Sequence, residues 1–240
     1  MLEEYVKVYD GPLYPTKQVL ELACAAQRFN GEYLKNEEAV YDKDNQNILY
    51  FKISNKALIR YTIDPENQNL IGMEQYMTLL KITPEDIARA EEIKTYYKKL
   101  VFAAISGDND FLTTVNSILN SEMVGLDKFG YVACLPSVQL KDQIHSKVKK
   151  VAKQVNETYL ANPGSWLTDL DCEILESIKS KNFEGFNICA IIDNKMVGWI
   201  SKNNLNIGPC VVVKAKVKDH STHWKHGNAV TRLHYVKAAQ

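Results

Sequence analysis

The chain has 240 residues, of which 45% are hydrophobic and 24% charged, the composition of a globular protein that buries a core. No apolar run approaches the roughly 20 residues that cross a bilayer. The N-terminal stretch MLEEYVKVYD lacks the basic and apolar regions of a signal peptide. Five scattered cysteines without a CxxC pair indicate reduced thiols. We therefore expect a cytoplasmic protein that does not enter a membrane.

Charge is unevenly distributed along the chain, although the net charge is zero. Residues 138–240 contain 15 Lys and Arg against 9 Asp and Glu, a net charge of +6. The rest of the chain contains 14 basic and 20 acidic residues, a net charge of −6. An anionic partner, if there is one, should therefore meet the back half of the chain.

The first predicted elements are a helix and a short β-hairpin. An apolar stripe over residues 15–29 predicts a helix that ends at Asn30-Gly31. The runs 47–54 and 57–63 predict two short strands, a hairpin near 47–63, because they are rich in β-forming residues and stop at a turn signal.

Three further helices follow. The clearest covers residues 83–105, because Thr83 is a good N-cap and Pro84 fits the first helical position. Residues 108–121 predict a second helix, capped by Asp108 or Asp110. A third helix is placed at about 137–160, and its exposed face carries the five lysines Lys141, Lys147, Lys149, Lys150 and Lys153.

After the NPGSW segment at residues 162–166 the apolar period changes from 3.6 to 2. We predict five strands there, at about 170–179, 186–193, 195–201, 209–219 and 228–238, with Asn194 in a tight turn. The fold class is therefore α+β, with a mainly helical domain over residues 1–161 and an all-β domain over residues 162–240.

The last two predicted strands each place basic side chains on one face. In VVVKAKVK the alternation predicts Val211, Val213, Ala215 and Val217 inside, and Val212, Lys214, Lys216 and Lys218 outside. In the final strand it predicts Thr231, Leu233 and Tyr235 on one face, and Arg232 and His234 on the other. The lysines suit an anion-binding surface, or they protect a sheet edge from aggregation.

The loop HSTHWKHG between these strands favours the binding interpretation. Trp224 should lie at the loop tip, beside Lys225, where an exposed indole is costly without a use. Nucleic-acid bases stack on aromatic rings while lysines follow the phosphates. Two structural alternatives remain open: Trp224 plugs one end of a barrel, and Trp199 packs in its core. For Trp199 we favour the core.

The same loop contains the pattern HxxHxxH. His220, His223 and His226 could hold zinc, with Cys210 or Asp219 as a fourth ligand. The segment is flanked by strands, however, and no second ligand pair lies nearby, so we predict no metal and no other cofactor. Motifs of nucleotide binding, serine hydrolysis and metalloproteolysis are missing from the chain, so we also predict that it is not an enzyme.

The run GPCVVVKAKVKDH followed by AVTRLHYVKA resembles the last two strands of OB-fold modules in bacteriophage replication and single-stranded DNA-binding proteins. The resemblance covers roughly residues 165–240, and the helical front part is weakly similar to phage proteins that carry such a module. It implies a five-stranded OB-like barrel that binds single-stranded nucleic acid across its second and third strands. The residues it implicates are Phe183, Phe186, Trp199, Lys202, Lys214, Lys216, Trp224, Lys225 and Arg232. The helix that usually joins the third and fourth strands is absent.

We therefore expect a non-enzymatic protein that binds single-stranded nucleic acid, with DNA favoured over RNA. It would be an accessory factor for phage replication or transcription in the host cytoplasm, and its acidic helical part would contact a replication or transcription protein. The alternative is a protein-interaction module that recruits or inhibits a polymerase, a helicase or a host enzyme through the helical half, because a fold does not determine a function.

Overall fold

The computed structural model describes residues 9–42, 47–64, 78–100, 110–155, 157–180, 183–223 and 227–240. The chain divides into two compact units, residues 1–140 and residues 141–240. These units coincide with the acidic and basic parts of the sequence, since residues 138–140 carry no charge. In its described part the first unit is mainly helical, and the second contains a closed five-stranded barrel, so the fold class is α+β as predicted.

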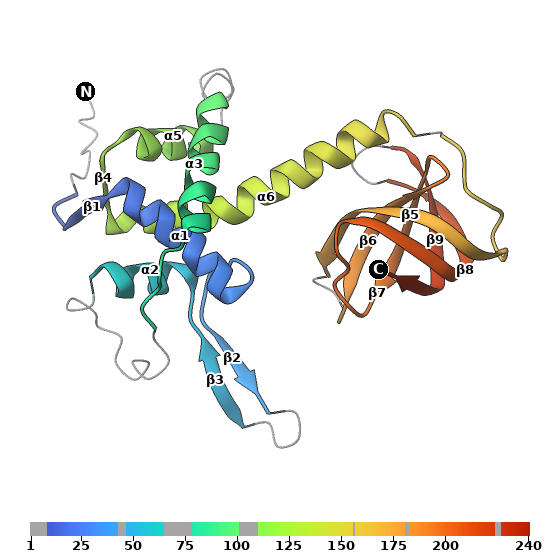
Figure 1. The fold of residues 1–240 in the computed structure, drawn as a ribbon, viewed down its shortest axis with the longest axis horizontal. Coiled ribbons are helices and arrows are strands. Elements are labelled where there is room, and N and C mark those ends of the chain that lie inside the picture. The colour runs from blue at the N-terminus through green and yellow to red at the C-terminus, as the bar shows by residue number, and fades with distance from the viewer. Residues whose placement is uncertain are drawn as a thin grey trace, which may run out of the picture. The chain divides into compact units, whose positions relative to one another are not determined.

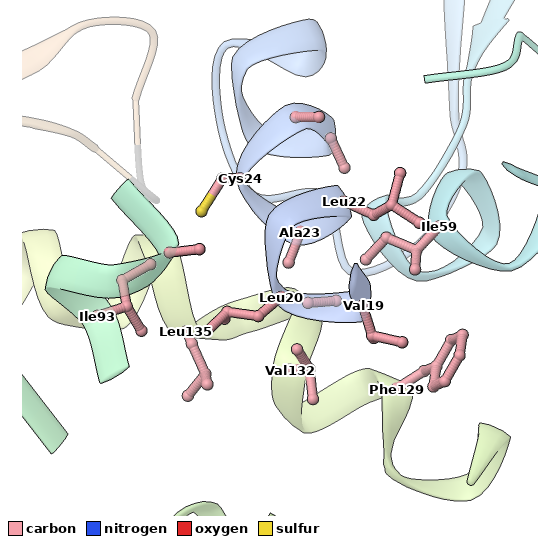
Figure 2. Close-up of a cluster of buried hydrophobic side chains, with 14 of the residues drawn as sticks. Val19, Leu20, Leu22, Ala23, Cys24, Ile59, Ile93, Phe129, Val132 and Leu135 are labelled. Carbon is pink, nitrogen blue, oxygen red and sulfur yellow. The ribbon is translucent and has the colours of Figure 1, made fainter. Parts of the chain in front are cut away.

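Helix α1 (Thr16–Asn30) lies at the centre of the first unit, as its apolar stripe predicts. Its residues Val19 and Ala23 are fully buried, and Figure 2 shows them between side chains of three other helices. Those side chains are Ile59 from α2 (Asn55–Ile63), Ile93 from α3 (Pro84–Lys99), and Phe129, Val132 and Leu135 from α6 (Phe129–Ala152). Gly31 ends α1 in the left-handed conformation, with a φ of 74°.

Helix α2 corrects our prediction of a strand at residues 57–63. Ser54 caps this helix, since its Oγ accepts a hydrogen bond from the Ala57 N–H at 3.3 Å. Leu58 and Ile59 are fully buried in the core of the unit. The β-branched residues of this segment favour a strand locally, but the cap and the burial of one helical face outweigh that preference.

Two small antiparallel pairs of strands complete the described part of this unit. Strand β1 (Leu13–Pro15) pairs with β4 (Met123–Gly125). Strand β2 (Glu38–Tyr41) pairs with β3 (Ile48–Lys52), so the hairpin lies at residues 38–52 and not at 47–63. Only β3 is predicted from the sequence. Strand β2, the short EAVY segment, has no alternating pattern.

The predicted capping of α3 is confirmed. Thr83 Oγ1 accepts a hydrogen bond from the Asp86 N–H at 3.4 Å, and Asp86 Oδ2 accepts one from the Thr83 N–H at 2.9 Å. This reciprocal arrangement is a capping box. Helix α5 (Asp110–Asn120) follows at the predicted place, whereas Asp108, one of its two predicted caps, lies outside the described residues.

Helix α6 begins and ends about eight residues earlier than the predicted 137–160. A proline inside a helix removes one of its backbone hydrogen bonds, which disfavours a helix through Pro136. The helix passes through Pro136, and a 3-10 turn, η2 (Leu126–Lys128), precedes it. Burial of Phe129, Val132 and Leu135 in the first unit favours the earlier start.

The barrel contains β5 (Trp166–Lys179), β6 (Phe186–Ile192), β7 (Lys195–Ser201), β8 (Gly208–Thr222) and β9 (Ala229–Ala239), which confirms the five predicted strands. Their closed order is β5-β6-β7-β9-β8. Strand β8 returns to lie beside β5, which makes a Greek key, and β9 closes the barrel by pairing parallel to β7 and antiparallel to β8. This topology is compatible with an OB-like barrel (Figure 1).

The barrel has its own apolar core, which includes Ile174, Ile188, Val212 and Leu233. The last part of α6 packs against it through Val148 and Ala152, which join Leu175, Met196 and Val230 in a second cluster. The predicted turn between β6 and β7 is confirmed, since Asp193 and Asn194 both have positive φ, as a two-residue hairpin turn requires. The predicted boundary at residues 161 and 162 stays a prediction, and the two compact units meet inside α6.

All five cysteines are free. Burial raises the pKa of the Cys24, Cys172 and Cys189 thiols to about 12, so these groups stay protonated. Among the described helices, none has a long enough apolar stretch to cross a membrane.

Candidate functional site

The outer face of the barrel carries two rows of side chains across β5, β8 and β9. In the first row Trp166 lies opposite Lys216, which lies opposite His234. In the second row Thr168 lies opposite Lys214, which lies opposite Lys237. We call the group formed by Trp166, Lys214, Lys216, His234, Tyr235 and Lys237 the aromatic-basic patch.

A β-bulge in β8 decides which side chains face outward. The register of β8 against β9 shifts between Val212 and Lys214, so Val213 is an extra residue. The inward positions are even-numbered before the bulge and odd-numbered after it. Val212 is therefore buried, while Val211 and Val213 are exposed, which corrects our prediction for these three valines. Ala215 and Val217 are buried and Lys214 and Lys218 exposed, as predicted.

Tyr235 also lies on the opposite side from the one predicted. Thr231 and Leu233 are buried as expected, but Tyr235 is 71% exposed. Its backbone has a φ of 53°, in the left-handed region that an aromatic residue rarely adopts. Strand β9 has one extra residue between the pairs of His234 and Lys237, and this local irregularity turns the Tyr235 ring outward.

The exposed rings and the lysines lie close to one another. Trp166 is 52% exposed, and its ring stacks near Tyr235 with centroids 6.4 Å apart and an interplanar angle of 25°. The Nζ atoms of Lys214 and Lys216 lie 4.5 Å and 5.6 Å from the centroid of the Trp166 ring, within cation–π range. The His234 ring contacts Tyr235, with centroids 4.4 Å apart.

The patch has an excess of positive charge. Within the described residues, Lys214, Lys216 and Lys237 form no ion pair. Lys214 lies directly opposite Lys237, and like charges in facing positions destabilise a sheet. The arrangement therefore costs stability in the absence of an anion and would gain stability from one.

Arg232 differs from these lysines because its charge is neutralised. Its guanidinium donates hydrogen bonds to both carboxylate oxygens of Asp219 on the facing strand. These bonds hold the pKa of Asp219 below its usual range, so both side chains stay charged and the ion pair stays formed. Arg232 is consequently a poorer anion ligand than the neighbouring lysines.

The structure describes four of the remaining residues that the resemblance implicates, and none of the four belongs to the aromatic-basic patch. Trp199 is 6% exposed and belongs to the barrel core, which is the alternative that we favoured for it. Phe186 packs against the same core. Phe183 lies exposed between β5 and β6, and Lys202 lies exposed just beyond β7. Trp224 and Lys225 lie outside the described residues.

The histidine pattern does not form a three-histidine site in the described part of the chain. His220 donates from Nε2 to the carbonyl oxygen of Ala161 at 2.8 Å, and its ring stacks on Tyr159. His226 lies outside the described residues, so the zinc hypothesis is untested there. Among the residues described, there is no group of three or more His, Cys, Asp or Glu side chains placed to hold a metal ion.

Sequence reasoning missed Trp166, His234, Tyr235 and Lys237 as members of one site. The NPGSW segment is predicted to precede the barrel strands, but its Trp166 begins β5. Strict alternation puts Tyr235 on the same face as Thr231 and Leu233. The signal that could have identified it is the dense basic and aromatic composition of RLHYVK. Comparison of the chain with protein-family models, curated proteins and solved structures finds no match.

Proposed function

We propose that the barrel unit, residues 141–240, binds single-stranded nucleic acid through the aromatic-basic patch. The observation that carries this proposal is the exposed Trp166–Tyr235 pair with Lys214 and Lys216 beside the Trp166 ring and Lys237 opposite Lys214; none of these lysines forms an ion pair with a residue that the structure describes. Exposed aromatic rings accept unpaired bases, and lysines bind the backbone phosphates. The net charge of +6 in this unit would attract a polyanion.

The patch differs from the surface that the resemblance implies. Binding across β6 and β7 would use Phe183, Phe186, Trp199 and Lys202, but the Trp199 ring is buried. The exposed rings lie instead where β5, β8 and β9 adjoin. We therefore assign base stacking to Trp166 and Tyr235, and phosphate binding to Lys214, Lys216 and Lys237. The patch contains few groups that could read base edges, so we expect weak sequence preference.

The wider role belongs to the same proposal. An accessory factor of phage replication or transcription remains our expectation, because such factors coat or hold single strands while other proteins act on them. Nothing in the patch distinguishes DNA from RNA, since it has no feature dedicated to a 2′-hydroxyl group.

Fluorescence anisotropy with labelled single-stranded and duplex oligonucleotides tests this function. We expect single strands to bind better than duplexes, and Trp166→Ala to weaken binding roughly 5- to 150-fold, the effect of about 1–3 kcal/mol per stacked base. If all three lysines contact phosphates, log K should fall with log salt with a slope of about −2. Replacing Lys214 and Lys216 by glutamine should make that slope shallower.

Two further variants locate the site. Lys17→Gln, on the exposed surface of α1, should leave binding unchanged. The double variant Phe183→Ala with Lys202→Gln should also bind normally. If this double variant loses binding while Trp166→Ala retains it, the β6–β7 surface is the site. If the wild-type protein binds no oligonucleotide at low salt, the proposed function is wrong.

A further inference from the structure

Beyond the aromatic-basic patch, the outer face of the barrel becomes acidic in one direction along β5. The exposed residues that follow Thr168 on this strand include Asp169, Asp171 and Glu173. Asp171 is three residues beyond Thr168, which is at most about 10 Å along a strand. Within the described residues, Asp169 and Asp171 form no ion pair. A polyanion that followed the strands in this direction would therefore meet two uncompensated negative charges.

The strands that face β5 do not offset this acidic end. Asp171 lies opposite Val211 on β8, and Val211 lies opposite Ala239 on β9, so their row contains no basic residue. Further along β5, Lys147 of α6 donates from Nζ to the carboxylate of Glu173 at 2.8 Å, which neutralises both charges. The row next to the patch on this side is therefore acidic without compensation from the paired strands.

In the opposite direction along β8 the surface remains basic. The buried residues Ala215 and Val217 alternate with outward-facing lysines, the last of which is the exposed Lys218. Among the described residues Lys218 forms no ion pair. Its sequence neighbour Asp219 is held through both carboxylate oxygens by Arg232. Lys218 is therefore available to an anion and extends the line of positive charge beyond the patch.

We propose, as an inference that rests on the proposed function, that the single strand lies along β8 over Lys214, Lys216 and Lys218, and that Asp169 and Asp171 define the end of the site. Lys214 and Lys218 are four residues apart, at most about 14 Å along a strand. That length accommodates about four nucleotides at a stacked spacing of ~3.4 Å. The substrate is therefore a short segment of single strand, at the lower end of the roughly 4–16 nucleotides that one OB fold covers.

The two aspartates determine where the bound strand leaves the barrel. Exposed charges are largely screened beyond about 8 Å at physiological ionic strength. Asp169 and Asp171 therefore act on the phosphate that would come next after the one at Lys214, and on few others. Like charges at such a boundary disfavour misplaced partners and fix the register of the correct one. The strand should turn into solvent there, whereas its other end continues past Lys218.

The salt dependence of single-strand binding tests this path. The three lysines of the patch together with Lys218 should give a slope of log K against log salt of about −3, and Lys218→Gln should reduce it to about −2. Asp171→Lys places a cation beyond the boundary, so it should tighten binding and steepen the slope by about 0.7. Glu184→Lys is the matched control, because it makes the same change of charge at an exposed residue between β5 and β6, and it should leave the slope unchanged.

A length series measures the size of the site with oligothymidylates of about 2 to 12 nucleotides. The wild-type affinity, divided by the number of overlapping placements on each oligonucleotide, should stop rising at about four nucleotides. In Asp171→Lys it should rise for about one nucleotide more. An affinity that keeps rising well beyond this length in the wild type would overturn the proposed boundary.

Circular dichroism establishes that each variant is folded, and the Lys218 and Asp171 variants test opposite ends of the site. Binding that depends on Trp166 but has a slope unaffected by both Lys218→Gln and Asp171→Lys would overturn this path and leave the proposed function standing. A slope that Glu184→Lys steepens as much as Asp171→Lys does would also overturn the path. Absence of any single-strand binding at low salt would overturn the path and the proposed function together.

Discussion

Tyr235 offers the sharpest test of the structure of the aromatic-basic patch, because its backbone is strained where its ring is exposed. We compare Tyr235→Gly with Tyr235→Ala. Both variants lose the ring and its contacts with Trp166 and His234. They differ only in how easily the residue adopts a φ of 53°. Any difference in their free energies of unfolding therefore reports the cost of that backbone conformation.

We expect the glycine variant to be more stable than the alanine variant, which is the reverse of the usual order. A residue with a Cβ atom pays about 1–2 kcal/mol in the left-handed region. Glycine avoids this cost but loses roughly 0.5–1 kcal/mol relative to alanine, because its unfolded chain has more conformational freedom. The glycine variant should therefore be more stable than the alanine variant by about 0.5–1 kcal/mol. At an ordinary strand position alanine is the more stable of the two.

Urea unfolding of both variants measures this difference. Lys237 is the matched control, because it is exposed on the same strand and is not among the residues with positive φ. Lys237→Ala should be more stable than Lys237→Gly. An alanine variant at residue 235 that equals or exceeds the glycine variant in stability would refute the argument. Both Tyr235 variants should weaken single-strand binding to the same extent, since both lack the ring that stacks on a base.

Three other predictions concern folding and pH. Val212→Ala should cost about 2 kcal/mol in urea unfolding by leaving a cavity, whereas Val213→Ala should stay within about 0.5 kcal/mol; equal costs would contradict the bulge. Thr83→Ala should lower the free energy of unfolding by about 1 kcal/mol, since it removes the N-cap of α3. An unchanged midpoint of urea unfolding would argue against that cap. Burial alone would raise the pKa of Asp86, but hydrogen bonds from Arg28 and Thr83 outweigh it and hold the pKa below its usual value. The stabilisation that the ionised Asp86 carboxylate provides should be complete above about pH 4 and lost as pH falls further. The difference in unfolding free energy between the wild type and Asp86→Asn should therefore shrink in acid; a difference independent of pH would contradict this.

Local sequence signals predicted the elements that depend on near neighbours. Thr83 and Pro84 marked the start of α3, Asn30-Gly31 the end of α1, and Asn194 a two-residue hairpin turn. Each signal acts within a few residues, through a cap, a fixed φ or a left-handed turn. The five barrel strands were equally predictable, because apolar residues alternate with a period of two in every one of them.

Contacts distant in sequence decided the rest. Residues 57–63, predicted as a strand, belong to α2 because Leu58 and Ile59 are buried in the core of the first unit. Helix α6 passes through Pro136 because its first turns fill the core of the first unit.

Sequence reasoning alone gave the α+β fold class, the net positive charge of the back half and the five strands of its all-β region. Which of its basic and aromatic residues share a surface depends on the pairing of β5, β8 and β9. A single extra residue at Val213 exchanges the inner and outer positions of β8, and another irregularity turns Tyr235 outward. Because such bulges depend on pairing with a neighbouring strand, alternation within one strand does not reveal them.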